Sequence, residues 1–365
     1  MPVAFNASMH SMWGGGRRAV AIGSDGLVGS GARQARRAPT VVLVGSGAAT
    51  MAEALAAAAP SARLLVVSSA AEGEAHLAAA EVVILADRLR PAYLRAPRLR
   101  WLHIIGAGVD GFSIAGLRDA PVLVTHKAEA SIVPMAEHVL AQILLIARRA
   151  LEYRALQAER RWVRHGEWPS NDLIELAGKT LGIVGLGRAG LAIARRARAF
   201  DLRVIGTKRQ TEVRLPHVAA IYPPERLREM LSAADFVAIT APLTDATQGL
   251  IGEPELRAMK RTAYLINISR GPIIQEAVLV RALREGWIAG ASLDVFEHEP
   301  LVPASPLWEL PNTIITPHCG GVGPNLGRDS AAEVAANLRR FVAGRPLHGV
   351  LNRADIVTSF EPPSH

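Results

Sequence analysis

The sequence predicts an α/β protein of two domains, each built around a parallel sheet, with the first domain discontinuous. Three observations carry this prediction. Short Val, Ile and Leu runs, apolar on both faces, alternate with Ala-rich helical stretches from Thr40 onward, a pattern typical of buried parallel strands. One long helical stretch separates these runs into two series. A last helix follows the second series and has no strand of its own to pack against.

The first series predicts the first domain. Its strands are expected at residues 41–44, 64–67, 82–85, 102–105 and 122–124. A single long helix, from Val133 to about Arg161, follows them. We expect a hinge within this helical stretch, near Arg149, where the chain passes to the second series.

The second series predicts the second domain. Its strands are expected at residues 181–184, 203–205, 236–239, 263–268, 288–293 and 313–315. The last helix, 331–342, is followed by Gly344, a typical helix stop. Because this helix lacks a strand partner here, we expect the chain to cross back at a second hinge near Gly320. The first domain then consists of residues 40–148 and 320–352, and the second of residues 149–319.

Composition limits the class of protein. A chain of 365 residues with 50% hydrophobic and 20% charged content can bury the cores of two domains. Its single cysteine, Cys319, excludes an intrachain disulfide framework and a Cys-rich metal cluster, so we expect no metal site and a cytoplasmic location. The longest apolar runs, such as 140–147, are too short to cross a bilayer, so no membrane partner is expected.

The two ends of the chain are expected to lie outside the domains. Residues 1–39 carry five arginines and one aspartate, which is half of the net charge of +8, and lack the period of a packed element. We therefore predict a disordered basic tail, with an organellar transit peptide or an upstream start codon as open alternatives. Residues 353–365 form a C-terminal tail. No long basic run interleaved with aromatic residues remains, which argues against a nucleic-acid partner.

A glycine-rich turn opens the second domain. Gly185, Gly187 and Gly190 form G-x-G-x-x-G between the strand at 181–184 and an Ala/Arg-rich helix. The first glycine permits the tight turn, the second lets backbone approach a pyrophosphate, and the third allows close packing of helix on strand. This context predicts a Rossmann-like, dinucleotide-binding domain at 149–319. The same alternation predicts a Rossmann-like or flavodoxin-like fold for the first domain.

Two nearby features qualify the nucleotide site. The turn after residues 41–44 also contains two glycines, but Thr50 stands where the third would be, so we interpret it as an ordinary strand-to-helix turn. At the end of the strand 203–205, where an NAD site places an acid, the chain has Lys208 and Arg209. Two cations suit a 2′-phosphate, so NADP(H) is the expected cofactor and NAD(H) the second choice. Solvated surface bases are the alternative interpretation of this pair.

Three further strand ends carry polar residues on the same expected sheet edge. Arg270, Glu299 and His318 follow the strands at 263–268, 288–293 and 313–315, and the carboxyl ends of parallel strands are where open α/β sheets bind ligands. Reduction of a keto acid needs a cation for the carboxylate, a proton donor for the developing alkoxide, and an acid that holds the donor charged. These three residues supply that set.

In these residues the chain resembles the D-2-hydroxyacid dehydrogenase family. The spacings of 29 residues from Arg270 to Glu299 and 19 from Glu299 to His318 agree with the family pattern. The resemblance runs from about Gly106 to Asn352 and includes the segments 134–138, 241–247 and 306–308.

The resemblance implies a role for each site residue. Arg270 would bind the substrate carboxylate and ketone oxygen, His318 would donate the proton, Glu299 would pair with His318, and Asp294 would face the nicotinamide carboxamide. A backbone loop in the first, substrate-binding (catalytic) domain would hold the substrate carboxylate: Gly106, Ala107, Gly108 and Val109. Besides the three glycines and Lys208 and Arg209, further residues are expected around the cofactor: Arg188, Ala189, Ala241, Pro242, Thr247, Ile268 and Gly320.

Differences within the family narrow the expected activity. Formate dehydrogenases carry Gln where Glu299 stands, phosphite dehydrogenases carry Lys where Ala107 stands, and many phosphoglycerate dehydrogenases have Arg near Ile104. The chain is therefore expected to be an NAD(P)-dependent oxidoreductase acting on a small, unphosphorylated 2-keto or 2-hydroxy acid, most similar to glyoxylate/hydroxypyruvate reductases. A dinucleotide-sensing regulatory protein with little turnover is the alternative. A homodimer is the expected assembly.

Overall fold

The computed structural model describes residues 38–45, 48–86, 89–105, 116–126, 129–164 and 173–353. The expected substrate loop at 106–109, the C-terminal tail after residue 353 and all but the end of the N-terminal tail lie outside these described residues. Among the described residues, no helix combines the length and apolar character that a membrane crossing requires.

The first sheet contains five parallel strands in the order β2-β1-β3-β4-β5. All five strands expected at the start of the chain are confirmed to within two residues. Their bounds are Thr40–Val44 (β1), Arg63–Val67 (β2), Val82–Leu85 (β3), Trp101–Ile104 (β4) and Leu123–His126 (β5). The central strand β3 is buried at every position, as expected when helices cover both faces of a sheet.

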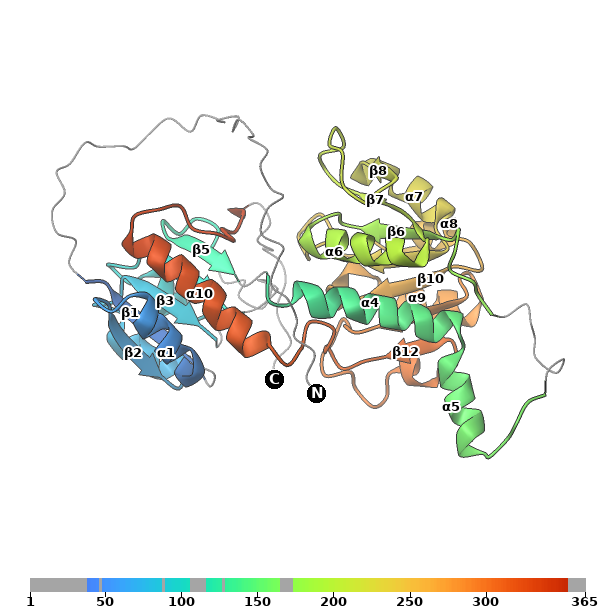
Figure 1. Cartoon of the computed structure of the whole chain (residues 1–365), viewed down its shortest axis with the longest axis horizontal. Coiled ribbons are helices and arrows are strands. Elements are labelled where there is room, and N and C mark those ends of the chain that lie inside the picture. Colours follow the sequence, from blue (N-terminus) through green and yellow to red (C-terminus); the bar gives the residue numbers. More distant parts are fainter. Residues whose placement is uncertain are drawn as a thin grey trace, which may run out of the picture. The chain divides into compact units, whose positions relative to one another are not determined.

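Helices pack on both faces of this sheet. On one face, α1 (Ala48–Ala58) lies beside α10 (Leu326–Val342), as Figure 1 shows. Val334 and Leu338 of α10 join the core that includes Leu55 and Trp101. The other face packs against the short helices α2 (Ala70–Gly73) and α3 (Pro91–Leu94). The last long helix of the chain therefore lies on the first sheet. Its expected start was five residues too late, because the first turn contains Gly327, Arg328 and Asp329 and lacks the apolar spacing that indicates a helix.

The second sheet contains seven parallel strands in the order β12-β11-β10-β9-β6-β7-β8. The six expected strands are present, and one edge strand, β8, was not expected because it is three residues long and only partly buried. The bounds are Thr180–Val184 (β6), Arg203–Thr207 (β7), Ala220–Tyr222 (β8), Phe236–Ile239 (β9), Tyr264–Asn267 (β10), Gly290–Leu293 (β11) and Thr313–Ile315 (β12). The strand order reverses beside β6, where open α/β sheets form a ligand crevice.

Four helices connect the strands of this sheet: α6 (Arg188–Ala197), α7 (Leu227–Ala233), α8 (Glu253–Ala258) and α9 (Glu276–Arg284). The helix that precedes the sheet differs from the expectation of one element over 133–161. It ends at Ala147 as α4 (Ile132–Ala147), Arg149 takes a left-handed φ of 50°, and a separate α5 (Ala150–Ala158) follows. The prediction of a single long helix over 133–161 is therefore wrong.

Packing explains the break. Val139 and Ile143 of α4 are fully buried in a core shared with Leu181 and Ile193 of the second sheet and α6, whereas α5 buries no residue. Figure 1 shows α4 alongside α6 and α5 projecting beyond it. The expected bounds place α4 in the first domain, but α4 packs on the second sheet. The domain bounds themselves remain a prediction.

Candidate active site

The glycine turn joins β6 to α6. Gly185 has a φ of +101°, and a Cβ there would lie 2.7 Å from the Ala241 nitrogen. A Cβ at Gly190 would lie 2.5 Å from the Gly185 oxygen, so helix and strand approach too closely for a side chain. At Gly187 a Cβ would meet nothing within 4 Å, and α6 has no side-chain cap. The open side and the uncapped N–H groups of Arg188 and Ala189 fit a pyrophosphate.

Two threonines that the sequence reasoning did not select hold this turn. Thr207 Oγ1 accepts a hydrogen bond from the Gly185 nitrogen at 3.0 Å, and Thr240 Oγ1 donates to the Gly185 oxygen at 2.6 Å. Each lies at the carboxyl end of a strand adjacent to β6. Hydroxyl residues at strand ends were visible in the sequence, but their relation to Gly185 depends on the strand order.

Lys208 and Arg209 follow β7. The Lys208 amide donates to the Tyr222 oxygen at 3.0 Å, and its Nζ lies 3.4 Å from the Leu186 oxygen. The ammonium therefore sits beside the glycine turn, while Arg209 is exposed. The end of the second strand of a Rossmann domain is where the ribose 2′ group is recognised. Both cations lie at that end of β7, and their contact with a 2′-phosphate remains a prediction.

The segment after β9 is folded on itself. Thr247 Oγ1 donates to the Pro242 oxygen at 2.6 Å and accepts from the Thr244 nitrogen at 2.8 Å. The Ser269 hydroxyl bonds to the Ala241 oxygen, which ties the ends of β9 and β10 together next to the buried Ile268. The expected cofactor residues Ala241, Pro242, Thr247 and Ile268 thus lie at one edge of the sheet.

Arg270 follows β10 and is positioned by Asn267. The Asn267 side chain donates to the Arg270 oxygen at 2.9 Å and accepts from the Ser269 nitrogen at 3.0 Å. The Arg270 Nη1 donates to the Ser269 oxygen at 2.6 Å. Gly271 has no room for a Cβ, which would lie 1.8 Å from the carbonyl carbon of Phe296. This close approach brings the Arg270 turn against the segment that leads to Glu299.

Glu299 and His318 form a direct pair. His318 Nδ1 lies 2.6 Å from Glu299 Oε2, and Glu299 Oε1 accepts from the Phe296 nitrogen at 3.0 Å. Burial raises the pKa of the Glu299 carboxyl, but hydrogen bonds from His318 and Phe296, together with the charges of His318 and Arg270, outweigh burial and leave that pKa below its usual value. Because Nδ1 binds the carboxylate, Nε2 is the ring nitrogen available to a substrate.

The neighbouring acid, Glu297, has a different task. Its Oε1 accepts from the Glu276 nitrogen at 3.0 Å, and Glu276 Oε2 accepts from the Glu297 nitrogen at 3.1 Å. Burial, aided by the charge of Glu297, raises the pKa of Glu276. The two glutamates cap each other at the start of α9, so the structure pairs Glu299, and not Glu297, with His318.

Asp294, at the end of β11, binds the loop that carries His318. Its side chain is 2% exposed. Oδ1 accepts from the Thr316 hydroxyl at 2.6 Å and the Cys319 nitrogen at 2.9 Å, and Oδ2 accepts from the Gly320 nitrogen at 2.7 Å. Its expected role toward a nicotinamide remains a prediction. Burial and the charge of Asp294 raise the pKa of the Cys319 thiol, which makes it a poor nucleophile.

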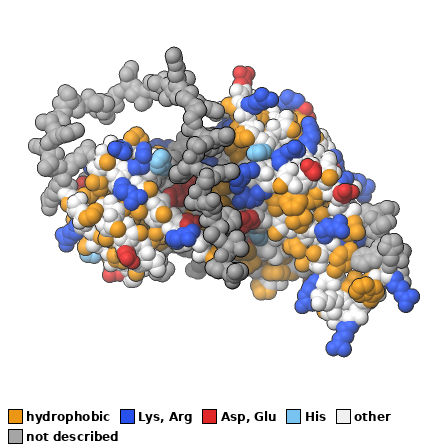
Figure 2. All heavy atoms as spheres, viewed as in Figure 1, with side chains coloured by type: hydrophobic (Ala, Val, Ile, Leu, Met, Phe, Trp, Pro, Cys, Tyr) orange, Lys and Arg blue, Asp and Glu red, His pale blue; other side chains and the backbone are white. Residues whose placement is uncertain are grey.

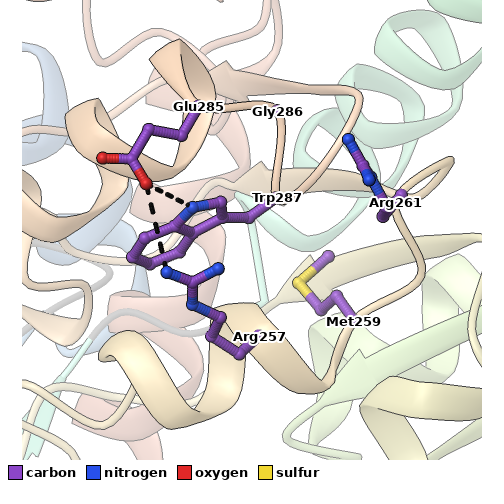
Figure 3. Close-up of a pocket in the computed structure, with 6 residues that line it drawn as sticks. All are labelled: Arg257, Met259, Arg261, Glu285, Gly286 and Trp287. Carbon is purple, nitrogen blue, oxygen red and sulfur yellow. Dashed lines mark hydrogen bonds and ion pairs between the residues drawn. The ribbon is translucent and has the colours of Figure 1, made fainter.

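A separate pocket lies on the opposite edge of the sheet. It has a volume of about 380 Å³. The Arg257 guanidinium lies below the Trp287 ring (Figure 3), and its carbon is 3.4 Å from the ring centroid. The Trp287 indole nitrogen donates to Glu285 at 2.8 Å. Its residues precede β10 and β11, so they lie away from Arg270 and His318. Arg257 lies in the last turn of α8, where the helix dipole favours a cation. We interpret this cluster as structural.

Comparison with known proteins identifies the family to which the chain is similar. Residues 140–320 match the model of the D-isomer specific 2-hydroxyacid dehydrogenase NAD binding domain. A glyoxylate reductase of Aeropyrum pernix is 38% identical over 284 residues, which cover 74% of this chain and 82% of that protein. One of Korarchaeum cryptofilum is 36% identical over 277 residues, covering 73% and 80%.

Solved structures agree. An NADPH-dependent glyoxylate/hydroxypyruvate reductase of Sinorhizobium meliloti, in complex with NADP and sulfate, aligns with a TM-score of 0.75 at 30% identity, over 87% of this chain and 99% of that one. A D-isomer specific 2-hydroxyacid dehydrogenase of Xanthobacter autotrophicus, in complex with NADPH and MES, aligns with a TM-score of 0.74 at 30% identity and the same coverage. The predicted fold class is confirmed, and the chain belongs to the D-isomer specific 2-hydroxyacid dehydrogenase family.

Proposed function

We propose that this NAD(P)-dependent oxidoreductase reduces small, unphosphorylated 2-keto acids such as glyoxylate and hydroxypyruvate, with NADP(H) as its preferred cofactor and NAD(H) as the weaker one. The observation that carries the proposal is the His318–Glu299 pair at 2.6 Å, close enough to Arg270 for its charge to lower the Glu299 pKa. A cation, a proton donor and an orienting acid are the set that keto-acid reduction requires.

The residues divide the work as follows. A guanidinium presents several donors in a fixed plane, so Arg270 would bind the substrate carboxylate and polarise the ketone oxygen. His318 would donate a proton from Nε2 to that oxygen as it becomes an alkoxide. Glu299, kept ionised by its lowered pKa, would stabilise the imidazolium and orient the ring. Hydride is the chemistry that a bound nicotinamide supplies.

The nucleotide site would be built from the glycine turn and the end of β7. The uncapped N-terminus of α6, with Gly187, Arg188 and Ala189, would hold the pyrophosphate. Lys208 and Arg209 would hold the 2′-phosphate. The relatives named above as NADPH-dependent or bound to NADP support this cofactor choice.

Turnover distinguishes the proposal from the regulatory alternative. NADPH oxidation would be followed at 340 nm with a panel of 2-keto acids that includes glyoxylate, hydroxypyruvate and 3-phosphohydroxypyruvate, and NADPH binding would be measured by fluorescence. We expect turnover with the small unphosphorylated acids. Tight NADPH binding without turnover of any acid would favour a dinucleotide-sensing protein instead.

Arg270→Lys is expected to lower kcat/KM for the best keto acid by at least about tenfold, because a point cation cannot reproduce a planar fork of donors. Steady-state kinetics would measure the loss. Arg261→Lys, at the pocket on the opposite edge, is the matched control and should be neutral. Normal kinetics for Arg270→Lys would remove Arg270 from the site.

Glu299→Gln is expected to lower kcat/KM for keto-acid reduction by at least about tenfold. The amide that replaces the carboxylate carries no charge to stabilise the imidazolium of His318 and accepts less strongly from its Nδ1. Steady-state kinetics would measure the loss. Wild-type kinetics in the variant would mean that Glu299 does not act on His318.

We expect a homodimer in the cytoplasm. A lone cysteine supports that location, and the exposed arm formed by α5 supports the dimer. Leu151 is 49% exposed and Trp162, just beyond the helix, is 89% exposed; Figure 2 shows hydrophobic side chains beside basic ones in this part of the surface. Sedimentation should give about twice the chain mass, and Trp162→Glu should weaken the dimer. A wild-type monomer at micromolar concentration would contradict this.

A further inference from the structure

His138, on α4, contacts the far side of the loop that carries His318. Its side chain is 15% exposed, and its Nε2 lies 3.4 Å from the Thr316 hydroxyl, 3.2 Å from Gln142 Nε2 and 3.9 Å from Asp294 Oδ1. The segment 134–138 was singled out in the sequence, but the proposed mechanism gives it no task. Here it reaches the end of β12, 178 residues away along the chain.

The hydrogen-bond partners of Thr316 and the buried Gln142 amide favour a proton on His138 Nε2. Both Asp294 carboxylate oxygens accept backbone N–H groups, and the Thr316 hydroxyl donates its proton to Oδ1 at 2.6 Å. The Thr316 oxygen can then only accept from His138, which requires a proton on Nε2. Reversing the Gln142 amide would present its oxygen to the same proton; that buried oxygen otherwise has no partner among the described residues.

This chain of donors ends on the backbone of the His318 loop, residues 316–320. His318 takes a left-handed φ of 51°, which is unusual for a residue with a side chain. Its backbone nitrogen donates to the backbone oxygens of Asp294 and Thr316 at 2.8 and 3.1 Å. The Asp294 carboxylate accepts from the backbone nitrogens of Cys319 and Gly320. A Cβ at Gly320 would lie 2.8 Å from Asp294 Oδ2 and 3.4 Å from the His138 ring. The loop is thus held between Asp294 and α4.

A metal site is the competing interpretation, because one ligand atom from each of His138, Asp294 and Cys319 lies within 4.8 Å of the others. The donors argue against it. Both Asp294 oxygens already accept backbone N–H groups, and Oδ1 also accepts from the Thr316 hydroxyl, so the carboxylate is committed to the loop.

We infer that His138 is a positioning residue for reduction: its Nε2–H, through Thr316 and Asp294, holds the loop that aims His318. This inference rests on the proposed function. Small misplacements of a proton donor lower the rate of the chemical step more than they lower cofactor affinity. Asp294 and Gly320 would lie at the nicotinamide end of the cofactor, but the glycine turn and Lys208, which would hold its phosphates, make none of these contacts.

The kinetic test compares His138→Leu with His138→Gln, whose amide can still donate, and with Glu137→Gln as a neighbouring control. We expect kcat to fall about tenfold or more in His138→Leu, with KM for NADPH within about threefold, and to recover to within about threefold of wild type in His138→Gln. If His138→Leu does not fold, Thr316→Val takes its place, and we expect it to show the same loss of kcat. Unchanged kcat in the Leu or Val variant, or equal losses in the Leu and Gln variants, would overturn the inference.

A second readout does not depend on turnover. In protein labelled with ¹⁵N-histidine, the His138 signal, assigned by its loss in His138→Gln, should show a proton on Nε2. A proton on Nδ1 alone would overturn the inference even if the enzyme is active. Absence of turnover in wild type, with the proton found on Nε2, would instead contradict the proposed function and leave the hydrogen-bond chain standing.

Discussion

His318→Asn is expected to lower kcat/KM for keto-acid reduction by about 100- to 10,000-fold, the range supplied by a positioned general acid. The asparagine amide can still bond Glu299, which holds the wild-type ring at 2.6 Å, but it cannot give up a proton at neutral pH. NADPH affinity should stay within about threefold, because the glycine turn is untouched.

The control for this prediction is another histidine. His348 is exposed and bonds Asn337 through its backbone, so His348→Asn should leave the kinetics unchanged. A His318→Asn enzyme that keeps more than about a tenth of wild-type kcat/KM would exclude His318 as the proton donor.

The second large effect concerns cofactor choice. With Lys208 and Arg209 at the end of β7, NADPH should bind about ten- to a hundredfold more tightly than NADH, since each charge-assisted contact contributes about 1.5 to 3 kcal/mol before desolvation and ordering costs. Lys208→Asp should reverse the order, because the carboxylate repels a phosphate and can accept from a free 2′-hydroxyl. Fluorescence titration with both cofactors measures the change.

Salt distinguishes charge from shape as the origin of this preference. Lys208 is half-buried and Arg209 is exposed, so much of the preference should shrink between low and high ionic strength. Arg345→Asp, the same charge change at an exposed position, should leave the ratio of the two affinities unaltered. NADH binding as well as NADPH in wild type would contradict this assignment and leave Arg270, Glu299 and His318 untouched.

The sequence predicted the strands well because they are buried on both faces. Residues 82–85 show the clearest apolar run and are buried throughout. The three-residue β8 has no such run, and the break at Arg149 depends on which helix face finds a partner, which is a tertiary property. Neither could be read from local periodicity.

Candidate site residues could be selected from the sequence where suitable chemistry and strand ends coincide, as at Arg270 and His318. The residues that hold them were not. Asn267, Thr316 and His138 are ordinary polar residues until the strand order places β10, β11 and β12 side by side and packs α4 beside them. The Gly271 contact with Phe296 likewise joins segments that the sequence separates.

The central claim is that this site carries out the reaction of its family on a small keto acid. Hydroxypyruvate tests it most directly, because its reduction product is chiral whereas that of glyoxylate is not. Wild-type enzyme would be incubated with hydroxypyruvate and NADPH, and the glycerate formed would be analysed by chiral chromatography. The account predicts D-glycerate in amounts equal to the NADPH consumed; L-glycerate, or no glycerate from protein that binds NADPH, would contradict it.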